Sequence, residues 1–237
     1  MRIEFCYPLY LFGGDMSVLN WLFEAEIHFG SKAILWREVL GNAFGLAGAI
    51  YGMRRKVWTW PVGMAGNILL FTVFLGAVFN TPQDKNLYGQ AGRQVFLILL
   101  SIYGWIIWSR NKGKSSKNAV SPRWATTRER LYILPVVVVF YLISFLLLKE
   151  LGSWAPIPDA WIFTGTVLAT YGMSKGFVEF WLVWIAVDAV GVPLLIKGGY
   201  YPSAILYGVY GAFVIWGFVS WLSIASREGS RTGKLEV

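Results

Sequence analysis

The sequence predicts an all-α integral membrane protein with seven transmembrane helices. The first reason is composition: 56% of the 237 residues are hydrophobic and 14% are charged. A soluble domain carries about 25% charged residues, so this chain has too few to cover a water-facing surface. The second reason is that seven apolar segments approach the roughly 20 residues that a helix needs to cross a bilayer. The third is the 13 Trp and 12 Tyr residues, which suit two membrane–water interfaces.

The seven spans follow one another with short connections, except for a longer linker after the third. The first has Gly41, Gly45, Gly48 and Gly52 on one face, a pattern typical of close helix packing. The fifth is the shortest and begins near Pro158, so we expect it to be tilted or partly interfacial. The predicted spans are 34–53, 58–80, 87–109, 131–149, 157–173, 177–196 and 203–225.

Ahead of the first span, segment 17–29 mixes apolar and acidic residues in a helical period. We interpret it as an amphipathic helix that lies on the membrane surface. It belongs to an N-terminal extension, 1–33, which precedes the first three-helix unit, 34–109. A basic linker and connector helix, 110–156, separate this unit from a second one, 157–225, and a tail, 226–237, ends the chain.

The distribution of positive charge predicts the orientation. The net charge is +8, and most of the 21 Lys and Arg fall on one side when the spans alternate. The positive-inside rule places that side in the cytoplasm, so the N-terminus is expected outside and the C-terminus in the cytoplasm. The linker then reads as a cytoplasmic tether attracted to anionic lipid, and nucleic-acid binding is not expected. The residues concerned are Arg54, Arg55, Lys56, Arg110, Lys112, Lys114, Lys117, Arg123, Arg128, Arg130, Lys175, Arg227, Arg231 and Lys234.

The two sides of the linker resemble each other. Tyr51-Gly52-Met53 recurs as Tyr171-Gly172-Met173, 120 positions later, and Gly45 recurs as Gly165 at the same offset. Further matches follow at offsets of 121 and then 113: Trp60 with Trp181, Asn67 with Asp188, Gly104 with Gly217, and Trp108 with Trp221. Spans one to three thus resemble spans five to seven. With span four as connector, both copies run in the same direction, a plan used by transporters with parallel repeats.

Polar residues at membrane depth mark candidate functional sites because they are costly there. In span six, Trp181, Trp184 and Asp188 are spaced i, i+3, i+7 and share one helical face. Two indoles beside a carboxylate would form a slot for a flat, polar ligand. The alternative interpretation makes the tryptophans part of an interfacial belt and pairs Asp188 with a packing partner.

Other polar residues lie in spans one to three. Gln90, Arg93 and Gln94 lie together in span three, and Asn42 and Asn67 lie in spans one and two. Each Asn is equally well interpreted as a ligand contact or as a hydrogen bond between helices. Arg93 requires a partner or a water-filled cavity, and the candidates are Glu38, Glu179 and Asp188.

The sequence lacks the residues that several classes of function require. There is no G-x-x-x-x-G-K-[ST] motif for ATP, and Cys6 and His28 are the only Cys and His. We therefore expect no cofactor, no metal site, no Ser/His/Asp catalytic set and no intrachain disulfide. A membrane enzyme is disfavoured on these grounds. A membrane scaffold remains a rival, and it predicts polar groups paired off without a cavity.

A set of motifs between residues 35 and 221 resembles the PnuC family of vitamin transporters. These are Trp60-Pro61-x-Gly63, Gln94, Tyr103-Gly104-Trp105-x-x-Trp108 and Trp181-x-x-Trp184. The resemblance implies a three-plus-one-plus-three fold with parallel repeats and a homotrimer. It also implies facilitated diffusion, in which intracellular phosphorylation traps the substrate. Nicotinamide riboside is the substrate of PnuC proteins, and relatives carry other vitamins.

The second half is more similar to the actinobacterial riboflavin-transporter branch, RibM. The matching residues are Val178-Glu179-Phe180-Trp181, Trp184, Val187-Asp188-x-Val190-Gly191-Val192-Pro193-Leu194, Tyr207-x-x-Tyr210-Gly211 and Trp216-Gly217. Asp188 stands where the nicotinamide riboside branch typically has Asn, which favours the riboflavin branch.

The resemblance implies riboflavin uptake across a bacterial cytoplasmic membrane, linked to an intracellular flavin kinase. Nicotinamide riboside, or another vitamin or nucleoside, is the alternative substrate. We expect Trp181 and Trp184 to stack on the isoalloxazine ring. Hydrogen bonds are expected from Asp188, Asn67, Gln90 and Gln94, and further contacts from Asn42 and Tyr207. Arg93 and Glu179 are expected to have gating or structural roles.

Overall fold

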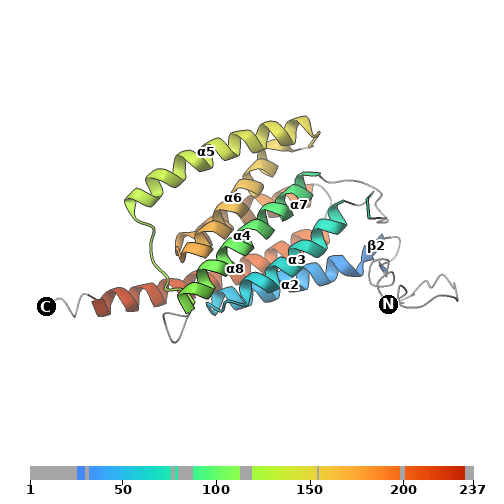
Figure 1. Cartoon of the computed structure of the whole chain (residues 1–237). Helices are drawn as coiled ribbons and strands as arrows, with labels where there is room; N and C mark the ends of the chain where they lie inside the picture. The colour runs from blue at the N-terminus through green and yellow to red at the C-terminus, as the bar shows by residue number, and fades with distance from the viewer. Residues whose placement is uncertain are drawn as a thin grey trace.

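The computed structural model describes residues 26–29, 32–75, 78–79, 88–112, 119–153, 155–197 and 201–232. This part of the chain folds into a two-stranded hairpin followed by seven α-helices (Figure 1). The antiparallel strands are β1 (Glu26–Phe29) and β2 (Lys32–Leu35). The helices are α2 (Trp36–Met53), α3 (Thr59–Phe74), α4 (Tyr88–Lys112), α5 (Thr127–Glu150), α6 (Pro156–Lys175), α7 (Glu179–Lys197) and α8 (Tyr201–Thr232).

Each predicted span has its helix, which confirms the seven-helix prediction for the described residues. The two largest differences at a boundary are in the seventh span, expected to end at residue 225, whereas α8 ends at Thr232, and in the second span, expected to reach residue 80, whereas α3 ends at Phe74. The prediction of a surface helix over 17–29 is wrong for Glu26–Phe29, which form β1. These four residues alternate polar and apolar side chains, and that is the period of a strand. Residues 17–25 lie outside the described part of the chain.

Three of the helices are long and apolar enough to cross a membrane by themselves. These stretches are Gln90–Lys112, Thr127–Glu150 and Tyr207–Arg227, and Thr59–Phe74 is a shorter apolar helix. The most apolar is α5, with a mean hydropathy of 2.7. It lies outside the other helices (Figure 1), and one of its contacts with them is Phe140, whose ring packs edge-to-face on Phe96 of α4 and Phe163 of α6. Most of its remaining surface is exposed, as expected for a helix that faces lipid.

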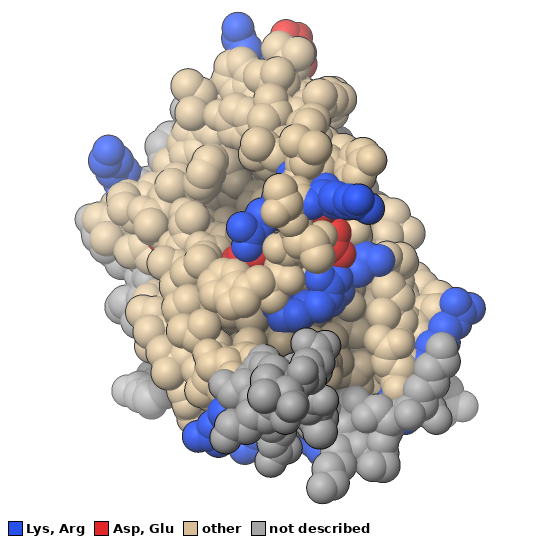
Figure 2. Space-filling model, turned by 90° about the vertical axis from the view of Figure 1, so that its left-hand side faces the viewer, with Lys and Arg blue, Asp and Glu red and all other residues tan. Residues whose placement is uncertain are grey.

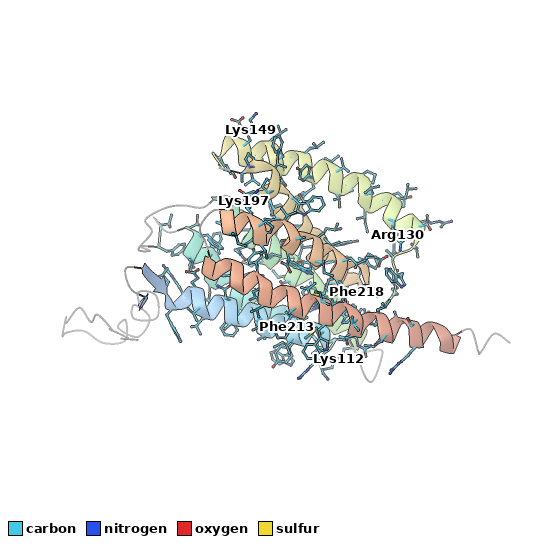
Figure 3. The ribbon with its side chains drawn as sticks, turned by 180° about the vertical axis from the view of Figure 1, so that it is seen from behind. Lys112, Arg130, Lys149, Lys197, Phe213 and Phe218 are labelled. Carbon is cyan, nitrogen blue, oxygen red and sulfur yellow. The ribbon has the colours of Figure 1, made fainter. Side chains whose placement is uncertain are left out.

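The helices run back and forth between two ends of the bundle. Lys149 and Lys197 lie at one end and Lys112 and Arg130 at the other (Figure 3). The end that carries Lys112 and Arg130 is called the linker end below. There α2, α4 and α6 finish, and α3, α5 and α7 begin. Within this bundle α2 packs on α3, α3 on α4, α6 on α7 and α7 on α8, while α4 also packs on α6 and α2 on α8.

Two tryptophan pairs pack in the same way in the two halves of the bundle. The rings of Trp60 and Trp108 meet edge-to-face, with centroids 5.2 Å apart. Those of Trp181 and Trp221 do the same at 5.9 Å. Trp60 lies on Gly104 and Trp181 on Gly217, so that a side chain at either glycine would overlap an indole. Because these residues match at the offsets found in the sequence, the two halves repeat a packing unit as well as a motif.

Two indole hydrogen bonds join the halves reciprocally. Trp108 of α4 donates Nε1–H to the carbonyl oxygen of Ser174 at the end of α6, over 3.0 Å. Trp221 of α8 donates to the carbonyl oxygen of Met53 at the end of α2, over 3.2 Å. Ser174 directly follows Met173, the repeat mate of Met53, so the two bonds are equivalent in the repeat to within one residue. The third helix of each half is therefore tied to the first helix of the other.

Alanine at Gly217 is expected to lower the free energy of unfolding by about 1–3 kcal/mol, because the added Cβ would overlap the Trp181 ring. Gly208 of the same helix has open space where its Cβ would be, so Gly208→Ala is a matched control. Alanine there should be neutral or stabilise the helix by about 0.5–1 kcal/mol. Thermal unfolding of both variants in detergent tests this packing, and equal stability of the two would contradict it.

Candidate functional site

The two predicted stacking residues on α7 have different surroundings. Trp181 is 4% exposed and packs among Gly217, Phe180 and Trp221. Its Nε1 is buried and has no hydrogen-bond partner. Trp184, three residues on, is half-buried at the edge of the same hydrophobic cluster. The ring of Trp184 is therefore partly exposed, whereas the ring of Trp181 is enclosed and its one unsatisfied polar group is the buried N–H.

Asp188 lies one turn beyond Trp184, where α7 meets α8. Its Oδ2 is 3.6 Å from where a Cβ of Gly211 would be, so the carboxylate lies beside α8 at van der Waals distance. This oxygen is buried without a hydrogen-bond partner. One turn further along α7, Gly191 contacts the ring of Tyr207. Tyr207 and Gly211 are themselves one turn apart on α8, so two consecutive turns of each helix meet here.

The same stretch of α8 also reaches α2. The hydroxyl of Tyr210 donates to the carbonyl oxygen of Asn42 over 2.9 Å and lies against Gly45. The side-chain amide of Asn42 donates to the carbonyl oxygen of Glu38 in its own helix. Three predicted site residues thus meet along one stretch of α8. Tyr207 belongs to α8 itself, as does Tyr210, while Asp188 comes from α7 and Asn42 from α2. We call these four residues the α8 site.

Tyr210 was not among the predicted site residues. Its sequence signal is the Tyr207-x-x-Tyr210-Gly211 motif, in which two phenols lie one turn apart. The motif does not show that the second phenol bridges to a helix 168 residues earlier in the chain.

The α4 residues form a second polar group. Gln94 is 1% exposed, and the Oε1 atoms of Gln90 and Gln94 and the Nε of Arg93 are buried without hydrogen-bond partners. Among the described residues, no hydrogen bond or ion pair joins them to the α8 site. On α3, Asn67 is half-buried and makes no hydrogen bond within the described residues. The structure thus places Gln90, Gln94 and Asn67 in the bundle without bringing them into contact with Asp188.

The expected ion partners of Arg93 are corrected by the structure. Glu179 accepts from the Ala125 N–H and from Arg130, whose Nη2 lies 2.6 Å from Oε1. The second ion pair of the described residues joins Arg123 to Glu129, so neither pair involves Arg93, Glu38 or Asp188. Glu179 fails as a partner because it begins α7 at the linker end, where the linker reaches it first.

The unsatisfied polar atoms extend beyond the predicted residues. Nε1 of Trp60, the repeat mate of Trp181, and Oγ1 of Thr164 on α6 are also buried without partners. Buried polar groups are nearly always hydrogen-bonded, and each exception calls for an explanation. Here the exceptions lie on α3, α4, α6 and α7, so polar atoms that could bond water or a polar ligand are spread over four helices of the bundle. The described residues contain no group of three or more His, Cys, Asp or Glu that could hold a metal.

The apolar helices are those of a multi-pass membrane protein. The family model described as "Nicotinamide mononucleotide transporter" matches residues 35–223. The chain belongs to this family, which confirms the resemblance to PnuC proteins noted from the sequence.

Individual relatives agree with this assignment. The chain is 39% identical to the riboflavin/roseoflavin transporter RibM of Streptomyces davaonensis, over 90% of this chain and 96% of that one. It is 24% identical to the nicotinamide riboside transporter PnuC of Escherichia coli, over 91% and 97%. The crystal structure of a vitamin B3 transporter PnuC shares the fold, with a TM-score of 0.64 and 19% identity over 81% of this chain and 83% of that one.

Proposed function

We propose that this protein takes up riboflavin across a bacterial cytoplasmic membrane. The observation that carries the proposal is the 39% identity to a riboflavin/roseoflavin transporter over nearly the whole of both chains. The site chemistry is compatible with it. Isoalloxazine is flat and has a polar edge, so the half-buried Trp184 would stack on the ring while Asp188 and Tyr207 accept or donate hydrogen bonds at its edge. Nε1 of Trp181, Gln90, Gln94, Asn67 and Asn42 are further candidates for the ring edge and the ribityl hydroxyls.

The fold we propose is a three-plus-one-plus-three arrangement of two parallel repeats, α2–α4 and α6–α8, with α5 as connector. Two features support it: the tryptophan–glycine packing that recurs at the sequence offsets, and the reciprocal bonds of Trp108 and Trp221. In transporters of this plan the substrate site lies near the bilayer midplane between the repeats. The α8 site has this character, since α8 contributes residues toward both α7 and α2.

The linker end is proposed to face the cytoplasm, with the N-terminus outside. Figure 2 looks onto this end and shows Lys and Arg side chains surrounding the acidic ones. Such an excess of basic residues is typical of cytoplasmic loops. The basic side chains would also attract the anionic head groups of the inner leaflet.

Nicotinamide riboside is the second candidate substrate, because a nicotinamide riboside transporter aligns over 97% of its length. Two differences favour riboflavin: the lower identity of 24%, and Asp188 in place of the amide expected in that branch.

We expect transport to equilibrate its substrate. The sequence has no nucleotide-binding loop, so an intracellular flavin kinase that removes free riboflavin would supply the driving force. Purified protein in liposomes should let labelled riboflavin reach the outside concentration and no more, with or without a proton or sodium gradient. Accumulation that depends on a proton gradient would contradict this, and Asp188 would then be the residue to examine as a proton carrier.

We also propose that three chains assemble, each with its own pathway. The molecular mass of the detergent-solubilised protein, corrected for bound detergent, should correspond to three copies of the 26.7 kDa chain. A monomer that transports at the full rate would argue against this assembly.

A further inference from the structure

Residues 119–126, here called the strap, cross the linker end between α4 and α5. The strap is bonded to both halves of the bundle. Ala119 donates its N–H to the carbonyl oxygen of Arg55, in the loop after α2, over 3.3 Å. The backbone N–H of Arg123 donates to the carbonyl oxygen of Gly176, and the carbonyl oxygen of Arg123 accepts from the N–H of Val178, both over 2.9 Å. Arg123 therefore pairs with Phe177 as in a parallel sheet.

The strap buries apolar side chains in the hydrophobic cluster that contains both tryptophan pairs. Ala119 is 2% exposed and Val120 8%, and both belong to the hydrophobic cluster of Trp60, Trp108, Trp181 and Trp221. Loops normally run over the surface with their side chains in solvent. A segment of a basic linker that is inserted among residues of both halves instead closes the space between them at this end.

Polar contacts bind the strap to the second half of the bundle, α6–α8. Both carboxylate oxygens of Glu179, the first residue of α7, accept from the N–H of Ala125, at 2.9 and 3.1 Å. The same carboxylate binds Arg130 just beyond the strap. Arg123 forms a two-pronged ion pair with Glu129 and lies over the ring of Phe177. The bond to Glu129 raises the pKa of Arg123. These partners are partly exposed, so the contacts can be broken by water.

We propose that the strap is the gate of the transport pathway at the linker end, and that Glu179 is its latch. The inference rests on the proposed transport function. If the substrate passes between the two repeats, it must leave through the space that Ala119 and Val120 fill, because these residues belong to the buried cluster that holds the tryptophans of both repeats and the strap is bonded to both. The strap must then lift at each cycle. Since α7 carries both Glu179 and Asp188, a shift of this helix on substrate binding would reach the latch directly.

A reversible cross-link tests whether the strap must lift. In a Cys6→Ser background, Arg123→Cys and Phe177→Cys place two thiols on paired backbones, which lie about 4.8 Å apart and within disulfide range. Oxidation should stop riboflavin transport in liposomes, and a reductant should restore it. Each single cysteine variant, oxidised in the same way, is the control. A cross-linked protein that transports at the rate of its reduced form would overturn the proposal, and so would failure of the thiols to join.

A second test needs no substrate. Val120→Cys in the Cys6→Ser background should react slowly with a water-soluble maleimide while the strap is down. Adding Glu179→Gln removes a charged acceptor from the Ala125 N–H and Arg130, and should speed labelling by about ten-fold. Glu150→Gln, at the opposite end of α5, is the matched control and should leave the rate unchanged. Equal rates with and without Glu179→Gln would overturn the latch. Because labelling is independent of cargo, it also distinguishes a wrong gate from a wrong substrate.

Discussion

Replacing Trp184 with alanine is expected to weaken riboflavin binding by about thirty-fold, the equivalent of about 2 kcal/mol. Trp184 is the half-buried indole of the predicted pair, and its loss would remove a stacking face and buried area together. Stability should change little, because the ring lies at the edge of the hydrophobic cluster. Binding can be followed by the quenching of tryptophan fluorescence when the flavin stacks.

Trp105→Ala is the control for this variant, because Trp105 is an exposed tryptophan on α4 that should not touch the ligand. An unchanged riboflavin affinity in folded Trp184→Ala protein would remove the stacking site. It would also remove the structural reason for preferring an aromatic vitamin.

Trp181→Ala is expected to act on folding, with a loss of about 3–5 kcal/mol in the free energy of unfolding. Trp181 is 4% exposed, so truncation would leave a cavity beside Gly217, Phe180 and Trp221. Thermal unfolding in detergent should show a large decrease for Trp181→Ala and a smaller one for Trp181→Phe, which keeps part of the ring volume.

The contrast with Trp184 is the sharper part of this prediction, since both residues lie on one face of one helix. A Trp181→Ala protein as stable as the parent would contradict the packing role. If such a protein also lost riboflavin affinity, both indoles would belong to the ligand slot predicted from their spacing.

The helices were predictable because hydropathy in a bilayer has a strong length requirement. All seven predicted spans have a helix in the described chain, and the error at the end of α3 is a boundary error. The hairpin was missed because four residues of alternation in β1 are too few to stand out beside a helical period. The tryptophan and glycine matches were visible as offsets. That Trp108 and Trp221 bond across to the opposite half depends on how the halves pack, which no local pattern encodes.

The candidate site was predictable as a set of residue types, but its grouping was not. Polar residues within the apolar spans were predicted as site residues, and the structure brings two of them, Asp188 and Asn42, toward α8. Three others are Gln90, Arg93 and Gln94 of α4. The structure leaves these three apart from the first two, because a contact between helices depends on their rotation as well as on depth. The linker was interpreted as a tether from its Lys and Arg content. Ala119 and Val120, two small apolar residues in a charged segment, carried too weak a signal to predict burial.

The central claim is that this family member carries riboflavin, and side-by-side uptake of labelled riboflavin and nicotinamide riboside tests it most directly. Both should be offered to the same liposomes at equal concentration, with the empty liposome as blank and each unlabelled compound as competitor. We expect rapid riboflavin uptake that excess nicotinamide riboside does not suppress, and nicotinamide riboside uptake close to the blank. Uptake of nicotinamide riboside with no uptake of riboflavin would contradict it.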